Sequence, residues 1–443
     1  MDRFMSLSYR LLPLIAPRLL WLFGTISISL AISVQSIGVE PARLPAVNDG
    51  FKISSTDWPW WRGPERNGAA SSEQSPPLSW SADENVVWKT AILGRGHGSM
   101  CLMGNRIFLQ TADDSSGAQS VLCLDRLSGK ELWKRIVHAS GGMRKNERST
   151  AASSTPACDG ERIFVNFPNS EELVTTALNI KGEQLWQTKV SGYIEHQGYG
   201  SSPALYQSLV IVSSDNKGGG AIAALDRVSG ETVWTRDRPK DPNYPSPIIL
   251  RAAGKDQVVL TGCDKVSSFE PLTGKTLWEI KGATTECVTS TVTDGLRVFT
   301  SGGYPRNHMS AVSADGKGTI EWENSSRLYV PSLLIREGSL FGTLDAGIAV
   351  CWESETGKEL WKNRLGGNFS ASPVLVGETI FATNEGGDTF IFRASKDGYE
   401  ELGRNHLGDE VFSTPVICDS RIYYRAAITV DGKRQEYLYC LGK

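Results

Sequence analysis

The stretch LDRLSGKELW, residues Leu124–Trp133, is the unit from which this 443-residue chain is built. It is typical of a β-hairpin, with an apolar strand, a turn of the form Asp-x-x-Ser-Gly and a second strand that ends in Trp. The Asp side chain can accept a hydrogen bond from the backbone of its own turn, and Gly supplies the positive φ. Each copy of the stretch therefore predicts a hairpin with a Trp at a fixed position.

Seven further copies occur along the chain. Close copies are LDRVSGETVW, EPLTGKTLW and ESETGKELW, and weaker ones are LNIKGEQLW and SADGKGTIEW. ENVVW keeps only the second half, and SKDGYEEL has Leu402 in place of Trp. The repeat tryptophans, predicted to pack between neighbouring units, are Trp88, Trp133, Trp186, Trp234, Trp278, Trp322 and Trp361. The eight copies are spaced 45, 53, 48, 44, 44, 39 and 41 residues apart, which favours a β-propeller over a helical solenoid.

A second phrase keeps the same spacing, with a small-residue or Ser-Pro start, an apolar strand, a turn and another apolar strand. Examples are STPACDGERIFVNF from Ser154, SSPALYQSLVIVSS from Ser201 and ASPVLVGETIFATN from Ala371. Two strands from this phrase and two from the hairpin make a four-stranded antiparallel blade. Eight such phrases accompany eight hairpins, so the sequence predicts an all-β, eight-bladed propeller.

The two ends of the repeat region are predicted to close the ring together. The last blade stops after a third strand, Glu436–Leu441, and its missing outer strand is found near the other end, around Trp88. Pairing these strands would remove two open sheet edges, which otherwise promote aggregation.

The N-terminal region is predicted to be separate from the propeller. Residues 1–36 contain three arginines and then the apolar run Leu19–Val34, which is short for a membrane span. We interpret residues 1–36 as a signal peptide, with an uncleaved signal anchor as the alternative. Residues 37–80 are assigned to a linker and Trp-rich strap, and residues 81–443 to the propeller. The protein is accordingly predicted to be exported to the periplasm or cell surface.

Composition excludes several classes of function. The net charge is −3 and no basic run occurs, which argues against a nucleic-acid partner. Most of the eight cysteines lie inside apolar strand phrases such as VLCLD, where Cys behaves as a small buried hydrophobe. The chain has no adjacent Cys pair and no C-x-x-C, so the spacing supports neither zinc nor covalent haem. No metal site is predicted.

The segment Asp57–Gly68, DWPWWRGPERNG, is too aromatic for a solvated linker. We interpret it as a strap or plug against the propeller wall. The alternative is an aromatic platform for a ligand, with Arg62 stacked on it.

The same segment, the following LSW and NVVWK, and the repeat LDxxSGKxLW resemble the pyrroloquinoline quinone (PQQ) type propeller repeat family. The resemblance covers roughly residues 57–443. It implies a propeller whose Trp docks between blades. The family includes PQQ-dependent dehydrogenases and the non-catalytic outer-membrane assembly factor BamB, so the fold does not decide the function. This chain lacks the vicinal cysteines and extra length of the dehydrogenases, and also the lipid-attachment Cys of BamB-like proteins.

A ligand-binding face is predicted from the loop classes. In a propeller, the loops between blades and the loops between the two middle strands of a blade open on one face, and long loops there usually carry binding. All five histidines fall in these loops, and the two longest loops between blades add a cation and a carboxylate. The candidate residues are His97, Arg148, Glu195, His196, His308 and His406. No catalytic residue can be assigned.

The sequence favours a monomeric, non-catalytic binding scaffold without a cofactor, which takes a protein partner or a small ligand on this face. Contact with a membrane is expected only through an uncleaved N-terminal segment. The alternative is a PQQ-dependent dehydrogenase that holds PQQ with Ca²⁺ at the axial mouth and oxidises an alcohol or sugar. Hydrolysis and polysaccharide binding are further alternatives.

Overall fold

The computed structural model describes residues 46–47, 49–143, 146 and 148–443. The predicted targeting segment 1–36 lies outside the described residues. The described residues belong to one compact unit, which contains β-strands and no helix among them. Within this part, therefore, no helix is long and apolar enough to span a membrane.

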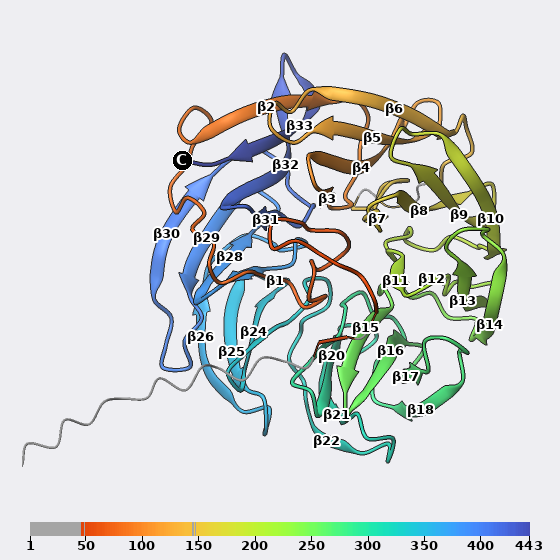
Figure 1. The fold of residues 1–443 in the computed structure, drawn as a ribbon. Helices are drawn as coiled ribbons and strands as arrows, with labels where there is room; N and C mark the ends of the chain where they lie inside the picture. The colour runs from red at the N-terminus through yellow and green to blue at the C-terminus, as the bar shows by residue number, and fades with distance from the viewer. Residues whose placement is uncertain (1–45, 48, 144–145, 147) are drawn as a thin grey trace, which may run out of the picture. The chain divides into compact units, whose positions relative to one another are not determined.

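The strands form eight blades around an axis (Figure 1). Blades 1 and 2 contain β3 (Cys101–Met103), β4 (Arg106–Ala112), β5 (Gln119–Asp125), β6 (Glu131–His138), β7 (Ala157–Cys158), β8 (Arg162–Asn169), β9 (Glu172–Asn179) and β10 (Gln184–Gly192). Blades 3 and 4 contain β11 (Ala204–Tyr206), β12 (Leu209–Ser213), β13 (Gly220–Asp226), β14 (Thr232–Arg238), β15 (Ile248–Ala252), β16 (Lys255–Gly262), β17 (Lys265–Phe269) and β18 (Thr276–Lys281). Blades 5 and 6 contain β19 (Val292–Thr293), β20 (Arg297–Gly302), β21 (His308–Ser313), β22 (Ile320–Asn324), β23 (Leu334–Arg336), β24 (Ser339–Leu344), β25 (Ile348–Glu353) and β26 (Glu359–Arg364). Blades 7 and 8 contain β27 (Val374–Val376), β28 (Thr379–Thr383), β29 (Asp388–Arg393), β30 (Glu401–His406), β31 (Val416–Cys418), β32 (Arg421–Val430), β33 (Lys433–Leu441) and β2 (Val86–Ile92).

The ring closes in blade 8, where β2 pairs antiparallel with β33. Trp88 lies opposite Cys440, and Ile92 lies opposite Glu436. Every pairing within the eight blades is antiparallel, while the short β1 (Ala69–Ala70) adds to blade 7 in the parallel sense. The predicted eight-bladed propeller and its closure near Trp88 are both confirmed.

Each repeat Trp meets the turn of the next blade at the circumference. Trp88 donates its Nε1–H to the carbonyl of Arg126 at 3.1 Å, and a Cβ on Gly129 would lie 2.4 Å from the Trp88 ring. Gly129 also has φ of 70°, so the turn needs Gly for both conformation and space. Five more repeat tryptophans donate to a carbonyl of the following blade: Trp133, Trp186, Trp234, Trp322 and Trp361.

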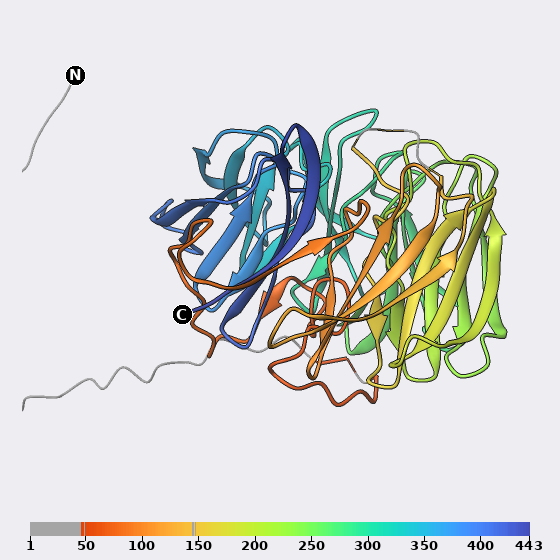
Figure 2. The same ribbon diagram turned by 90° about the horizontal axis from the view of Figure 1, so that it is seen from above.

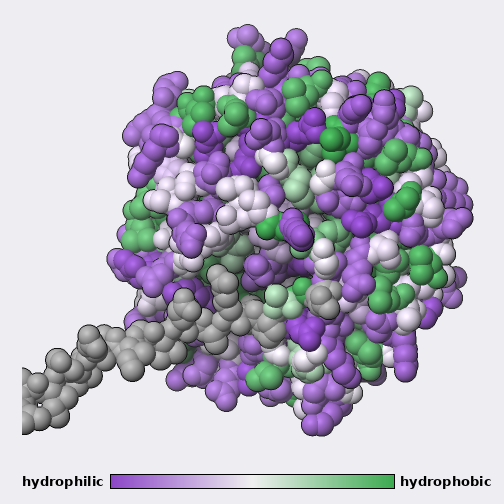
Figure 3. All heavy atoms as spheres, in the orientation of Figure 1, coloured by the Kyte–Doolittle hydropathy of each residue, from purple (hydrophilic) through white to green (hydrophobic). Residues whose placement is uncertain are grey.

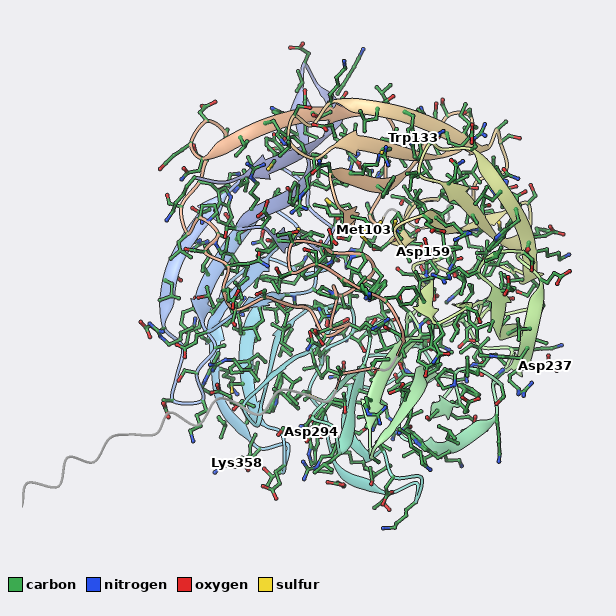
Figure 4. The ribbon with its side chains drawn as sticks, viewed as in Figure 1. Met103, Trp133, Asp159, Asp237, Asp294 and Lys358 are labelled. Carbon is green, nitrogen blue, oxygen red and sulfur yellow. The ribbon has the colours of Figure 1, made fainter. Side chains whose placement is uncertain are left out.

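The junction between blades 4 and 5 is different. Trp278 donates to Oε1 of Gln257 in its own blade at 2.8 Å, and the facing Gly316 would bring a Cβ only to 3.9 Å from the ring. Trp88, Trp234 and Trp278 are buried, and the other repeat tryptophans are half-buried. Figure 4 shows Trp133 at the edge of the ring, with Met103 and Asp159, next to the innermost strands, near its centre.

Residues 57–70, called the strap below, cross the innermost strands on one face of the ring (Figures 1 and 2). Trp58 and Leu102 exchange backbone hydrogen bonds of 2.9 and 2.8 Å, and Cys158 donates to the carbonyl of Pro59 at 2.8 Å. On the far side, Leu375 donates to the carbonyl of Gly68 at 3.0 Å. The strap therefore contacts blades 1 and 2 near its start and blade 7 near its end.

The core is divided among the blades rather than gathered in one centre. Apolar side chains of neighbouring blades pack together in separate clusters around the ring. All eight cysteines are buried and free. Burial raises the pKa of the Cys123 thiol to about 12, so this thiol is inert packing rather than a nucleophile.

Candidate functional site

A cavity of about 740 Å³ lies on the axis, with Trp61 of the strap in its wall. Its other lining residues come from the innermost strand starts and from the two loop classes that open on the face opposite the strap. Backbone hydrogen bonds hold each strand within its blade. The loops lie outside this ladder, so their side chains can point toward the axis.

A belt of eight hydroxyl residues surrounds this cavity, one from each blade: Ser99, Thr155, Ser202, Ser246, Ser290, Ser332, Ser372 and Thr414. In most links the backbone N–H of one blade donates to the hydroxyl of the next, as from Thr155 to Ser202 at 2.9 Å and from Ser332 to Ser372 at 3.0 Å. Ser99 Oγ closes the circle by donating to the carbonyl of Thr414 at 2.7 Å. The Ser-Pro starts in the sequence are therefore hydrogen-bonding links between blades.

Between blades 4 and 5 the strap bonds to one member of the belt. Trp61 donates its Nε1–H to Ser290 Oγ at 2.8 Å. Arg62, which the platform hypothesis placed on the aromatic rings, is instead buried, and it donates to the carbonyls of Pro373 and Leu333. Burial lowers the pKa of Arg62 to about 9. The guanidinium that lies over an indole is that of Arg66, 4.3 Å from the Trp60 ring centroid.

One side of the cavity wall is built around Glu286. Its Oε1 lies 3.6 Å from His196 Nδ1, and its Oε2 accepts a hydrogen bond from the hydroxyl of Tyr329 at 3.5 Å. His196 Nδ1 also lies 3.1 Å from the hydroxyl of Tyr244. Burial, and then Glu286, raise the pKa of both tyrosines, so both phenols are neutral at physiological pH.

Two more carboxylates line the cavity, Asp345 and Glu385. Asp345 accepts the backbone N–H groups of Tyr329 at 2.9 Å and Val330 at 3.1 Å, and thus holds the loop between β22 and β23. Burial raises the pKa of Asp345 despite these bonds. Glu385 accepts a hydrogen bond from Ser370 Oγ at 2.6 Å.

His97 and Arg148 stand on the opposite side of the wall. The His97 ring is stacked on Phe412 with centroids 4.2 Å apart, and its Nδ1 lies 3.0 Å from the carbonyl of Arg148. Burial, and then the charge of Arg95, lower the pKa of His97 well below its usual range. The imidazole is therefore neutral at pH 7 and supplies no positive charge. Arg148 is exposed at the mouth, as is Arg327.

The structure brings three of the six candidate residues together and leaves three outside. His97, Arg148 and His196 line the cavity. Glu195 is buried without lining it, and His308 is buried on β21 with Nε2 3.3 Å from Glu323. His406 is exposed at the end of β30, 3.1 Å from Asp388. Loop class alone placed these residues, and it does not state the distance of a side chain from the axis.

Several lining residues were missed by the sequence reasoning: Tyr244, Tyr329, Asp345 and Glu385. Their loops were recognisable, but tyrosines and carboxylates are common in loops and carry no spacing signal. The belt did leave a signal, since Ser or Thr recurs at the start of every innermost strand.

The residues present do not fit a calcium-bound quinone. PQQ is a tricarboxylate, which needs nearby cations for its own charges and oxygen ligands converging on the metal. In the described part of the chain, no group of three or more His, Cys, Asp or Glu side chains is placed to hold a metal ion. The buried wall also presents the Glu286 carboxylate, whereas both arginines of the lining are exposed.

The fold and its hydroxyl belt define a closed propeller of the PQQ repeat type. The family model of the outer membrane protein assembly factor BamB matches residues 117–349 and 334–401. These ranges cover more than half of the chain, which therefore belongs to the BamB-like family of PQQ-type propellers.

Two relatives of known name show similar sequences. Outer membrane protein assembly factor BamB of Burkholderia pseudomallei (strain K96243) is 24% identical over 370 residues, 79% of this chain and 87% of that protein. Tetrathionate hydrolase of Acidithiobacillus ferrooxidans is 23% identical over 318 residues, 68% of this chain. The match spans only about half, 51%, of the hydrolase.

Two solved structures resemble the fold. BamB from Moraxella catarrhalis matches with a TM-score of 0.56 and 15% identity, over 80% of this chain and 96% of that one. A europium-containing methanol dehydrogenase matches with a TM-score of 0.62 and 11% identity, over 88% of this chain and 98% of that one. At these identities the likeness concerns the fold alone.

Proposed function

We propose that this protein is a non-catalytic binding propeller, which takes a protein partner or a small ligand at the mouth of its axial cavity. The observation that carries the proposal is the cavity of about 740 Å³, open among loops and closed on the other side by the strap. A concave site lined by aromatic rings and a few polar groups on a rigid scaffold is the usual form of a binding site.

The chemistry of the wall supports binding over catalysis. The tyrosines at Glu286 are neutral, the cysteines are buried, and His97 is an uncharged ring stacked on Phe412. On the strap face, the space-filling view shows hydrophobic residues scattered among hydrophilic ones (Figure 3), which gives no reason to place a partner there.

The same proposal includes a protein partner and export, because the family supports both. The Burkholderia pseudomallei relative is named as an assembly factor for outer membrane proteins. With an N-terminal segment read as a signal peptide, the proposal places this chain outside the cytoplasm.

Site-specific photo-cross-linking tests the proposal. A benzoylphenylalanine in place of Tyr304, a cavity residue that is 55% exposed, is expected to cross-link the partner in cells. The same group in place of Val233, 52% exposed on β14 at the circumference, serves as the matched control. An Arg148→Ala, His196→Ala double variant should weaken the cross-link at position 304.

Cross-linking that is equal at both positions, or unchanged in the double variant, would contradict binding at the cavity. Titration of the purified protein with PQQ and Ca²⁺ tests the alternative. A stoichiometric quinone spectrum with dye-linked oxidation of an alcohol or sugar would replace the scaffold by a dehydrogenase.

A further inference from the structure

We infer that the axial cavity holds an organic cation, an ammonium or guanidinium group, against Glu286. This inference rests on the proposed binding function and names the chemistry of the occupant. The cation comes either from a free amine or from a Lys or Arg side chain of a polypeptide.

Glu286 is a buried carboxylate without a strong cationic partner. It is 8% exposed and lines the cavity, and its contacts are the Tyr329 hydroxyl at 3.5 Å and His196 at 3.6 Å. Among the described residues, no Lys or Arg forms an ion pair with it. Burying an unpaired charge is costly, so a bound cation would relieve that cost.

Other buried carboxylates of the same chain show how such a charge is normally compensated. Asp215 is paired with Arg238 at 3.0 Å, and Glu436 with Arg425 at 2.6 Å. Both pairs lie inside the blades and need no ligand. Glu286 faces the cavity, and there the position of the cation is open to an occupant.

The surroundings of Glu286 suit an organic cation. The Tyr329 hydroxyl donates to the carboxylate, the Tyr244 hydroxyl contacts His196 beside it, and Tyr304 pairs with Glu286 through a backbone bridge. Both phenols remain neutral, so their hydroxyl oxygens can accept hydrogen bonds from a cation without competing charge. Aromatic residues beside a carboxylate are a common setting for binding an ammonium group.

The position of the arginines selects which cation fits. Arg148 and Arg327 are exposed in the cavity lining, whereas Glu286 is buried and Asp345 and Glu385 are half-buried. An occupant with one cation deep in the cavity and neutral or acidic groups near the mouth would suit both the buried carboxylate and the exposed arginines. A molecule with several cations along its length would meet the arginines and bind less well.

Calorimetric titration of the full chain at low ionic strength tests the inference with three probes. Acetyl-Gly-Lys-Gly amide should bind at least tenfold more tightly than acetyl-Gly-norleucine-Gly amide, which has a similar shape without the charge. Butylammonium distinguishes the sources: binding equal to that of the Lys peptide indicates a free amine, and weaker binding indicates a side chain. Both results support the cation site.

Glu286→Gln should lower the affinity of the protein for the Lys peptide to its affinity for the norleucine peptide. Glu323→Gln, which removes an exposed carboxylate outside the cavity lining, should leave the affinity unchanged. Equal affinity of the two peptides for the unaltered protein would overturn the inference without any variant. If that happens while the cross-link through position 304 persists, the binding function stands and only the cation site is lost.

Discussion

The circumference of the ring and the wall of its cavity use repetition in opposite ways. At the circumference, the same contact recurs from blade to blade, a Trp against the Gly turn of its neighbour, as in Trp88 with Gly129. At the cavity, only the hydroxyl belt recurs. Above the belt each blade contributes something different, such as His97 on one side and Glu286 on the other.

The difference separates what holds the blades together from what faces a ligand. A contact that supports most junctions is kept in most copies, because each blade buries its apolar side only against its neighbours. A ligand contacts each blade from a different direction, so the side chains around it need not match. The residues that break the repeat at the axis are therefore the candidates for binding.

The largest expected effect comes from opening the ring. Deletion of residues 81–90 removes most of β2 and exposes the edge of β33. We expect loss of cooperative unfolding, measured by circular dichroism on heating, together with aggregation. Val87→Ser, at an exposed site on the same strand, is the control and should unfold like the unaltered protein.

Loss of a single repeat Trp at the circumference should lower the stability less than opening the ring. Trp234→Ala removes a buried indole and its 3.0 Å hydrogen bond to the carbonyl of Pro271, so we expect a loss of about 3–5 kcal/mol in the free energy of unfolding. Leu402→Ala, at the copy without Trp, should cost less, because Leu402 is only partly buried and Trp80 packs in the same cluster. Denaturant titration measures the free energy of unfolding of both variants. An equal loss in the two would show that the repeat Trp is not the main contact between blades.

The junction between blades 4 and 5 lacks two of the usual hydrogen bonds. Trp278 donates within its own blade instead of to the next one, and among the described residues no belt hydrogen bond joins Ser246 to Ser290. Trp61→Phe keeps an aromatic ring but removes the hydrogen bond to Ser290, so we expect a loss of about 1 kcal/mol. Ser290→Ala removes the acceptor of the same hydrogen bond, so the double variant should lose no more stability than the larger of the two single losses. Additive losses in the double variant would show that this bond does not support the junction.

The smallest effect concerns the pH dependence of stability. His97 has a pKa below its usual value of about 6.5 in the folded chain, so below that pH the unfolded chain binds the extra proton. Stability should therefore fall as the pH drops from about 6.5 toward 5. His97→Asn keeps a donor for the carbonyl of Arg148 and should make this slope shallower by at most about 1.4 kcal/mol per pH unit. Val233→Asn, at an exposed position on β14, introduces the same residue without removing a titratable group and should leave the slope unchanged.

The sequence by itself determined the number of blades, their four strands and the closure near Trp88. These features are local and repeated, since a turn such as Asp125–Gly129 and a strand that ends in Trp133 are specified within a few residues. It also placed the inter-blade loops, and so put His97, Arg148 and His196 in the right segments.

Only the tertiary structure decided which side chains meet at the axis. Glu286, Tyr244 and Tyr329 come from three different loops, and no spacing in the chain states that they converge. The same holds for Arg62, whose charge is held by the carbonyls of Pro373 and Leu333, far away in the sequence. Contacts within a blade follow from neighbouring residues, whereas contacts across the axis depend on the closed ring.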